Sequence, residues 1–213
     1  MSSESFYVAE IFASIQGEGW YAGYPHILVR FSGCNLECTY CDTSYARKGG
    51  VRLELDDIMR NIKSLRIKRV LITGGEPILQ TGLMMLVKRL LDEGLFVSVE
   101  TNGTLPIRDL TPLSHIIMDI KTPGSGMNKY NLYENLKFLK EGDEVKFVLT
   151  SRADYEWSKE KLYLIPDGII VDFSPAYNLI SPKELAKWIL RDRLDVKLHL
   201  QLHKILWGDE RGR

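Results

Sequence analysis

Short apolar runs of strand type alternate in this chain with longer segments of helical period, and no other feature restricts its fold as strongly. Several runs, such as Val70–Ile72 and Ile116–Met118, are apolar at every position, a pattern typical of parallel strands that are covered on both faces. Strands and helices in alternation predict an α/β fold. The expected strands are Phe6–Ile11, Ile27–Phe31, Arg69–Thr73, Phe96–Thr101, Ile116–Lys121, Glu144–Thr150, Gly168–Phe173 and Lys197–Leu202.

The segments between these strands predict helices. Gly94 is a natural helix stop, and Ser181, Pro182 and Glu184 combine an N-cap serine, a first-turn proline and a capping-box glutamate. Eight strands could close a barrel, but such barrels typically have about 250 residues and this chain has 213. We therefore expect one domain, residues 1–213, folded as a partial TIM-like barrel of mostly parallel strands with flanking helices. The expected helices are Leu55–Leu65, Gln80–Glu93, Asn131–Lys140, Tyr155–Lys161 and Ser181–Arg191.

The charge balance narrows the class of partner. Lys plus Arg and Asp plus Glu both total 28, which argues against nucleic acid or an anionic membrane surface as the partner. The first residues lack the pattern of a signal peptide, and no apolar run reaches the length of a membrane span.

All three cysteines fall between residues 34 and 41. Such an odd, clustered set suits metal binding in a reducing cytoplasm better than disulfides.

Cys34, Cys38 and Cys41 have the spacing C-x3-C-x2-C. Three thiolates on one short loop can ligate three irons of a [4Fe-4S] cluster and leave the fourth iron open, since the chain has no fourth cysteine. The alternatives are buried structural cysteines or a zinc site completed by a histidine. The nearest histidine in sequence is His26.

A glycine-rich loop follows the apolar run Val70–Ile72. It contains Gly74, Gly75 and Glu76, followed by a proline, at the carboxyl end of an expected strand, where α/β folds place their sites. Its other interpretation is an ordinary strand-to-helix turn.

Together these motifs resemble the radical S-adenosylmethionine (SAM) superfamily, and their order resembles that of its 7-carboxy-7-deazaguanine synthases. The resemblance runs from about residue 7 to residue 207 and includes motifs at residues 12–19, 41–43, 100–104, 119–121 and 201–204. It implies that Thr43 binds Mg2+ and that His203 lies on a terminal strand. It implies SAM contacts at Tyr40, Asp42, Gly74, Gly75, Glu76, Gly103, Asp119, Lys121 and Ser174, and substrate contacts at Ile15, Gln16, Gly17, Glu18, Arg30, Thr101 and His203.

The activity implied by the resemblance is a radical ring contraction. In that family the 5′-deoxyadenosyl radical from SAM takes a hydrogen atom from 6-carboxy-5,6,7,8-tetrahydropterin, which rearranges and loses ammonia, on the route to queuosine or archaeosine. The resemblance also implies a flavodoxin or ferredoxin as electron donor and a homodimer. Two other functions stay open, a glycyl-radical-enzyme activase and a non-enzymatic Fe–S or zinc module. Gln16, Glu18 and Arg30 could equally be solvated, Thr43 a turn cap, and His203 a core or edge histidine.

Overall fold

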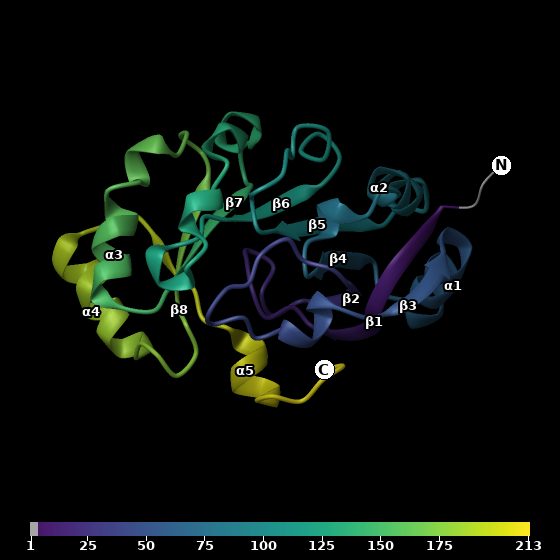
Figure 1. Cartoon of the computed structure of the whole chain (residues 1–213), viewed down its shortest axis with the longest axis horizontal. Helices are drawn as coiled ribbons and strands as arrows, with labels where there is room; N and C mark the ends of the chain where they lie inside the picture. The colour runs from purple at the N-terminus through teal and green to yellow at the C-terminus, as the bar shows by residue number, and fades with distance from the viewer. Residues whose placement is uncertain (1–3) are drawn as a thin grey trace.

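The structure is a computed structural model that describes residues 4–213. Its strands form one nine-stranded sheet in the order β3-β1-β2-β4-β5-β6-β7-β8-β9, which leaves β3 and β9 as edges within these residues. In Figure 1 the sheet is strongly curved. The strands are β1 (Ser5–Ile15), β2 (Pro25–Phe31), β3 (Val51–Glu54), β4 (Arg69–Gly74), β5 (Phe96–Thr101), β6 (His115–Asp119), β7 (Glu144–Leu149), β8 (Ile170–Pro175) and β9 (Lys197–Leu198).

From β2 through β9 every pair of neighbouring strands in this sheet is parallel, whereas β1 is antiparallel to both β2 and β3. An open, mostly parallel sheet with flanking helices confirms the predicted partial barrel. Figure 1 shows α1, α2, α3 and α4 around the outside of the curve and α5 on its open side. The helices are α1 (Leu55–Leu65), α2 (Leu83–Asp92), α3 (Arg152–Lys159), α4 (Pro182–Asp192) and α5 (Leu202–Trp207), with short 3-10 helices η1 (Ser44–Arg47), η2 (Pro77–Leu79), η3 (Pro123–Ser125), η4 (Asn128–Tyr130), η5 (Tyr133–Phe138) and η6 (Leu162–Leu164).

The two faces of the sheet differ in chemistry. On β7, Val145, Phe147 and Leu149 belong to the main hydrophobic core, and the intervening Lys146 and Val148 line a cavity on the concave face. This alternation follows from the two-residue period of a strand. The runs Val70–Ile72 and Ile116–Met118 are buried at every position, as predicted, and on the concave face Leu28, Leu71 and Ile117 form a small apolar cluster beside the cavity.

Most predicted elements are confirmed, and α1 and β5 have the predicted bounds. Gly94 adopts a φ of 71° and ends α2 as expected. Pro182 occupies the first turn of α4 as predicted, but the Ser181 side chain makes no cap hydrogen bond. A capping box is present at the start of α1, where it joins Glu54 and Asp57.

Two predicted elements are wrong. The segment Asn131–Lys140 forms the 3-10 helix η5, because the Asn135 amide is buried and donates to the carbonyls of Gly103 and Leu105, which fixes the chain locally. The strand predicted at Lys197–Leu202 pairs only at Lys197 and Leu198. The edge strand β3 and the helix α5 were not predicted.

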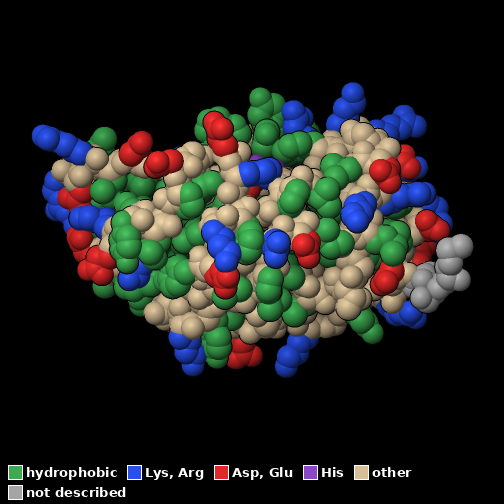
Figure 2. All heavy atoms as spheres, turned by 90° about the horizontal axis from the view of Figure 1, so that it is seen from above, with side chains coloured by type: hydrophobic (Ala, Val, Ile, Leu, Met, Phe, Trp, Pro, Cys, Tyr) green, Lys and Arg blue, Asp and Glu red, His purple; other side chains and the backbone are tan. Residues whose placement is uncertain are grey.

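The surface carries charges of both signs. In Figure 2, basic and acidic side chains are interspersed over the face shown and do not form a surface of one sign. None of the helices in residues 4–213 has both the length and the apolar composition needed to cross a membrane.

Candidate active site

A cavity of about 700 Å³ lies on the concave face of the sheet, at the carboxyl ends of the parallel strands. The carboxyl ends of the strands are where α/β barrels place ligands. The cavity there brings the three cysteines together with residues from all along the chain. Other residues that had been predicted to bind Mg2+, SAM or substrate and that line it are Ile15, Gln16, Gly17, Glu18, Arg30, Tyr40, Asp42, Thr43, Gly74, Gly75, Thr101, Asp119, Lys121 and His203.

The cysteines lie on the loop that connects β2 to η1. All three are free and partly exposed toward the cavity. The Cys34 sulfur accepts from the backbone N–H of Leu36 at 3.4 Å, and burial raises the pKa of Cys34 and of Cys38. Three partly buried thiols facing one cavity fit the donor set of an iron–sulfur cluster, and binding the metal would supply the positive charge that favours their thiolate forms.

The two glycines of the β4 loop bring β4 close to the cysteine loop. A Cβ at Gly75 would lie 2.0 Å from the carbonyl oxygen of Gly33, and one at Gly74 would lie 2.3 Å from that of Phe31. Gly74 also has a φ of 143°, a region that suits glycine. The glycines thus allow the chain to pack against its own cysteine loop, and Gly74 and Gly75 also line the cavity.

Glu76 is fully buried and lies outside the cavity lining. Its carboxylate accepts hydrogen bonds from the Thr101 hydroxyl at 2.8 Å and from the Asn102 backbone N–H at 2.7 Å. Burial raises its pKa to about 7. In this structure Glu76 therefore links the β4 loop to the end of β5.

Gly103 and Ser174 also lie outside the cavity lining. Gly103 has a φ of 73°, and a Cβ there would lie 2.5 Å from the Asp119 carbonyl oxygen. Ser174 is buried in β8. Neither Gly103 nor Ser174 therefore lines the cavity in this structure.

The cavity is also lined by a cation that is held in a fixed orientation. Arg30 on β2 donates its Nε–H to Glu10 at 2.7 Å, and Glu10 also accepts from the Tyr45 hydroxyl at 2.6 Å. These bonds hold the guanidinium in one orientation, as a bidentate contact to a carboxylate requires. Gln16, at 2% exposure, also lines the cavity, but at the start of β2, where its N–H donates to the Tyr24 carbonyl at 2.9 Å.

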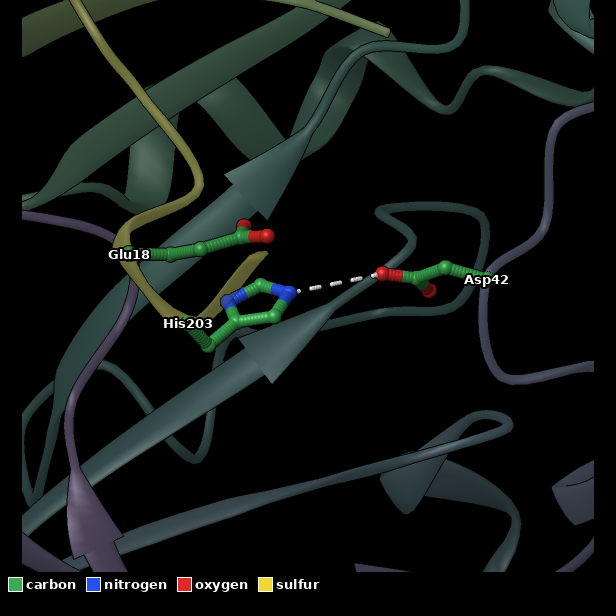
Figure 3. A group of neighbouring side chains, drawn as sticks. All are labelled: Glu18, Asp42 and His203. Carbon is green, nitrogen blue, oxygen red and sulfur yellow. Dashed lines mark ion pairs between the residues drawn. The ribbon is translucent and has the colours of Figure 1, made fainter. Parts of the chain in front are cut away.

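His203 lies on α5, so its predicted place on a strand is wrong. Figure 3 shows its ring pointing toward Asp42, with Nε2 3.7 Å from the carboxylate, and Glu18 alongside. One ligand atom from each of these three side chains lies within 4.8 Å of the others. Burial lowers the pKa of His203, but the Asp42 and Glu18 carboxylates outweigh it and raise that pKa overall.

The segment around His203 is held against residues 16–19. The Gly19 N–H donates to His199 Nε2 at 2.7 Å, Gln201 donates to Glu18 at 2.9 Å, and the Leu202 N–H donates to the Gly17 carbonyl at 2.9 Å. A Cβ at Gly17 would lie 2.2 Å from His203 Nδ1. Segments about 180 residues apart therefore build one wall of the cavity.

Lys146 is the main cavity residue for which the sequence predicted no role. Its ammonium pairs with Glu18 and Glu100 and lies 3.4 Å from Asp119. The available signal was a lysine within a strand that is apolar at every other position after Glu144. A buried lysine is rarely left unpaired.

His26 cannot complete a zinc site with the cysteines. It is fully buried at the start of β2, where its Nδ1 contacts the Tyr24 carbonyl, whereas the cysteines follow the other end of that strand.

Comparison with known proteins agrees with this geometry. Residues 28–146 match the Radical SAM superfamily. A 7-carboxy-7-deazaguanine synthase of Chlorobaculum tepidum is 42% identical over all of both chains, and one of Thermoplasma acidophilum is 35% identical over 96% of this chain and 99% of the relative. The crystal structure of QueE from Escherichia coli superposes with a TM-score of 0.78 at 23% identity, over 93% of this chain and 95% of that one.

The matched segment contains the cysteine loop, the glycine loop and the strands β4 to β6, which define a radical SAM enzyme. The chain belongs to the 7-carboxy-7-deazaguanine synthase family. Membership in the superfamily implies a [4Fe-4S] cluster and SAM as cofactors.

Proposed function

We propose that this chain is a 7-carboxy-7-deazaguanine synthase that converts 6-carboxy-5,6,7,8-tetrahydropterin into 7-carboxy-7-deazaguanine and ammonia. The observation that carries the proposal is one cavity lined by three free cysteines, an arginine held by Glu10 and polar residues from several strands. The relatives that match over the full chain length share the name of this activity.

Cys34, Cys38 and Cys41 would hold the [4Fe-4S] cluster. With SAM bound, the cluster would supply one-electron reduction of the SAM sulfonium, using an electron from an external donor. Gly74, Gly75, Asp119 and Lys121 line the cavity next to the cysteines, and the nearby Asp119 carboxylate, opposing the effect of burial, keeps Lys121 charged. The residues proposed to bind SAM through side chain or backbone are Tyr40, Asp42, Gly74, Gly75, Glu76, Gly103, Asp119, Lys121 and Ser174.

The pterin would bind at the wall formed by residues 15–18 and Arg30. Arg30 is fixed by Glu10 and offers a planar cation to the substrate carboxylate. Glu18 offers a carboxylate to the N–H groups of the pyrimidine ring, and Gln16 supplies both a donor and an acceptor. Ile15, Gly17, Thr101 and His203 complete the proposed substrate contacts, and all of them line the cavity.

Mg2+ is proposed on the Thr43 hydroxyl. Thr43 follows the cysteine loop directly and lines the cavity, and its Oγ1 lies 3.9 Å from the Cys41 sulfur. A hydroxyl oxygen suits a cation that prefers hard ligands and keeps several waters. A metal there could also bind the carboxylate of the substrate.

The cluster also needs an electron source and protection. We propose a flavodoxin or ferredoxin as the donor, a homodimeric single-domain enzyme covering residues 1–213, and a cytoplasmic location. The free thiols of the cysteine loop support a reducing compartment.

An anaerobic turnover assay tests the proposal. We expect the reconstituted protein, given SAM, Mg2+, a reductant and 6-carboxytetrahydropterin, to form 7-carboxy-7-deazaguanine by mass spectrometry. Cys34→Ala should abolish product, and Thr43→Ala should weaken the Mg2+ dependence without removing iron. Formation of 5′-deoxyadenosine from SAM without the product would keep the radical SAM chemistry and reject this substrate.

A further inference from the structure

Lys146 lies at the centre of the polar wall of the cavity. Its side chain is 5% exposed and extends from the concave face of β7. Three carboxylates from three other segments surround it: Glu18 before β2, Glu100 on β5 and Asp119 on β6. A buried ammonium with three carboxylate partners is costly to assemble, so the arrangement calls for a role beyond packing.

The contacts of Glu18 show what Lys146 controls. One carboxylate oxygen of Glu18 accepts from Lys146, and the other accepts from Gln201 at 2.9 Å. Both oxygens are therefore fixed in place, and each keeps lone-pair capacity for a ligand. Glu18 also lines the cavity beside His203 and Asp42.

We propose that Lys146 is a positioning residue that holds the Glu18 carboxylate ionised and oriented, so that it can accept two N–H groups from the pyrimidine edge of the pterin. This inference rests on the proposed function. An ionised carboxylate accepts at both oxygens, whereas a protonated one turns an acceptor into a donor and loses the match to a donor pair.

The electrostatics of the site support this role. Burial raises the pKa of Glu18, but Lys146, His203 and His199 together outweigh burial and hold that pKa well below its ordinary value. The other charged or titratable groups that face Glu18 are Glu100, Asp42, His199 and His203. Removing the Lys146 ammonium takes away the largest contribution that lowers the Glu18 pKa, so burial and the two carboxylates are then opposed only by the two histidines. The ionised form should therefore be lost at a higher pH than in the wild type.

The chain offers a matched control. Lys197 on β9 also lies beside two buried acidic side chains, 3.1 Å from Asp172 and 3.5 Å from Glu144. Neither Lys197 nor these two acids line the cavity. Lys197→Met removes a lysine from buried acids without touching Glu18. Lys146→Arg keeps the charge at the original position.

The experiment measures equilibrium binding of 6-carboxypterin, a non-reacting analogue, to the cluster-loaded protein with SAM under anaerobic conditions. Dialysis separates free ligand, which is read by its fluorescence, at pH values from about 6 to 9. We expect Lys146→Met to raise the Kd by about tenfold or more at the acidic end, since a charged hydrogen bond is lost, and by less at the alkaline end. The ratio of the variant Kd to the wild-type Kd at each pH cancels the effect of the ligand's own titration.

Lys146→Arg should restore most of the affinity, and Lys197→Met should bind like the wild type. In a Glu18→Gln background, Lys146→Met should have little further effect and no pH dependence, because coupled residues are not additive. An equal effect of Lys146→Met in both backgrounds would mean that Lys146 contacts the ligand directly and would overturn the inference, as would wild-type binding by Lys146→Met. Wild-type protein that neither binds 6-carboxypterin nor turns over its tetrahydro form would instead reject the proposed function.

Discussion

Two sides of a single strand, β7, are built for different purposes. Val145, Phe147 and Leu149 lie on the convex side of the strand, in the main hydrophobic core, and each is fully buried. Lys146 and Val148 alternate with them on the concave side and line the cavity. The convex residues stabilise the fold by removing apolar surface from water. Lys146 instead pairs with buried carboxylates, an arrangement that a core built only for stability would not need.

The difference separates stability from function at neighbouring positions. A substitution on the convex side of the sheet should act on the free energy of unfolding, and one on the concave side should act on ligand binding or on the pH dependence of stability. Three substitutions test this division, in order of decreasing effect.

Phe147→Ala should have the largest effect on stability. The Phe147 ring is fully buried and packs edge-on against Phe173 at 5.5 Å. Its removal should cost about 3–5 kcal/mol of unfolding free energy, measured by urea unfolding under anaerobic conditions. Val148→Ala, one position along on the cavity side, is the control and should cost clearly less. Equal losses would contradict the division between the two faces.

Asp172→Asn should have an intermediate effect that depends on pH. Burial raises the pKa of Asp172 to about 8, and the adjacent Glu144 contributes. Between about pH 4 and pH 8 this carboxyl is ionised in the unfolded chain but protonated in the folded one, so its contribution to stability is lost as pH rises.

The melting temperature of the wild type should therefore fall from about pH 7 to pH 8.5, above the range in which His199, whose pKa burial lowers to about 4, contributes in the opposite sense. Asp172→Asn should flatten this slope. The slope that remains should have the same sign, because burial also raises the pKa of Glu76 to about 7. Identical slopes in variant and wild type would show that Asp172 is ionised in the folded protein.

Leu190→Gln should have the smallest effect. Leu190 lies on α4 with its side chain 76% exposed, so the change should stay within about 0.5 kcal/mol in the same unfolding assay. Leu185→Ala, at a fully buried position of the same helix, should cost about 2–5 kcal/mol. A large effect of Leu190→Gln would indicate that this surface is covered in solution.

The sequence predicted the convex side of the sheet well. The helical pattern of α1 and the strand-type residues of β5, in which apolar and polar side chains alternate from Val97, led to their observed bounds, because burial on that side leaves a regular pattern. The edge strand β3 has only four residues and one neighbouring strand, so its pattern is too short to detect. At Lys197–Leu202 the chain leaves the sheet after two residues and turns into α5, a tertiary effect that a strand-like sequence does not show.

The concave side was predicted by motif and not by periodicity. The spacing of Cys34, Cys38 and Cys41 identified the loop that faces the cavity. Lys146 carried no motif, and its importance depends on carboxylates 46 and 128 residues away in sequence. Conversely, Glu76 belongs to a recognised motif but is fully buried between β4 and β5. Sequence motifs were enough to identify the loops of the site, whereas the ion pairs of Lys146 could be recognised only from the folded structure.

The wall formed by residues 16–19 and 199–202 has a consequence for the order in which the molecule is made. Gly19 and Glu18 receive their partners His199 and Gln201 only from residues 180 and 183 positions later. During synthesis the cysteine loop leaves the ribosome well before residues 199–202, and the wall that orients Glu18 is finished only after Gln201 has emerged. A growing chain therefore cannot complete its binding wall while only the cysteine loop and the strands that follow it have been made.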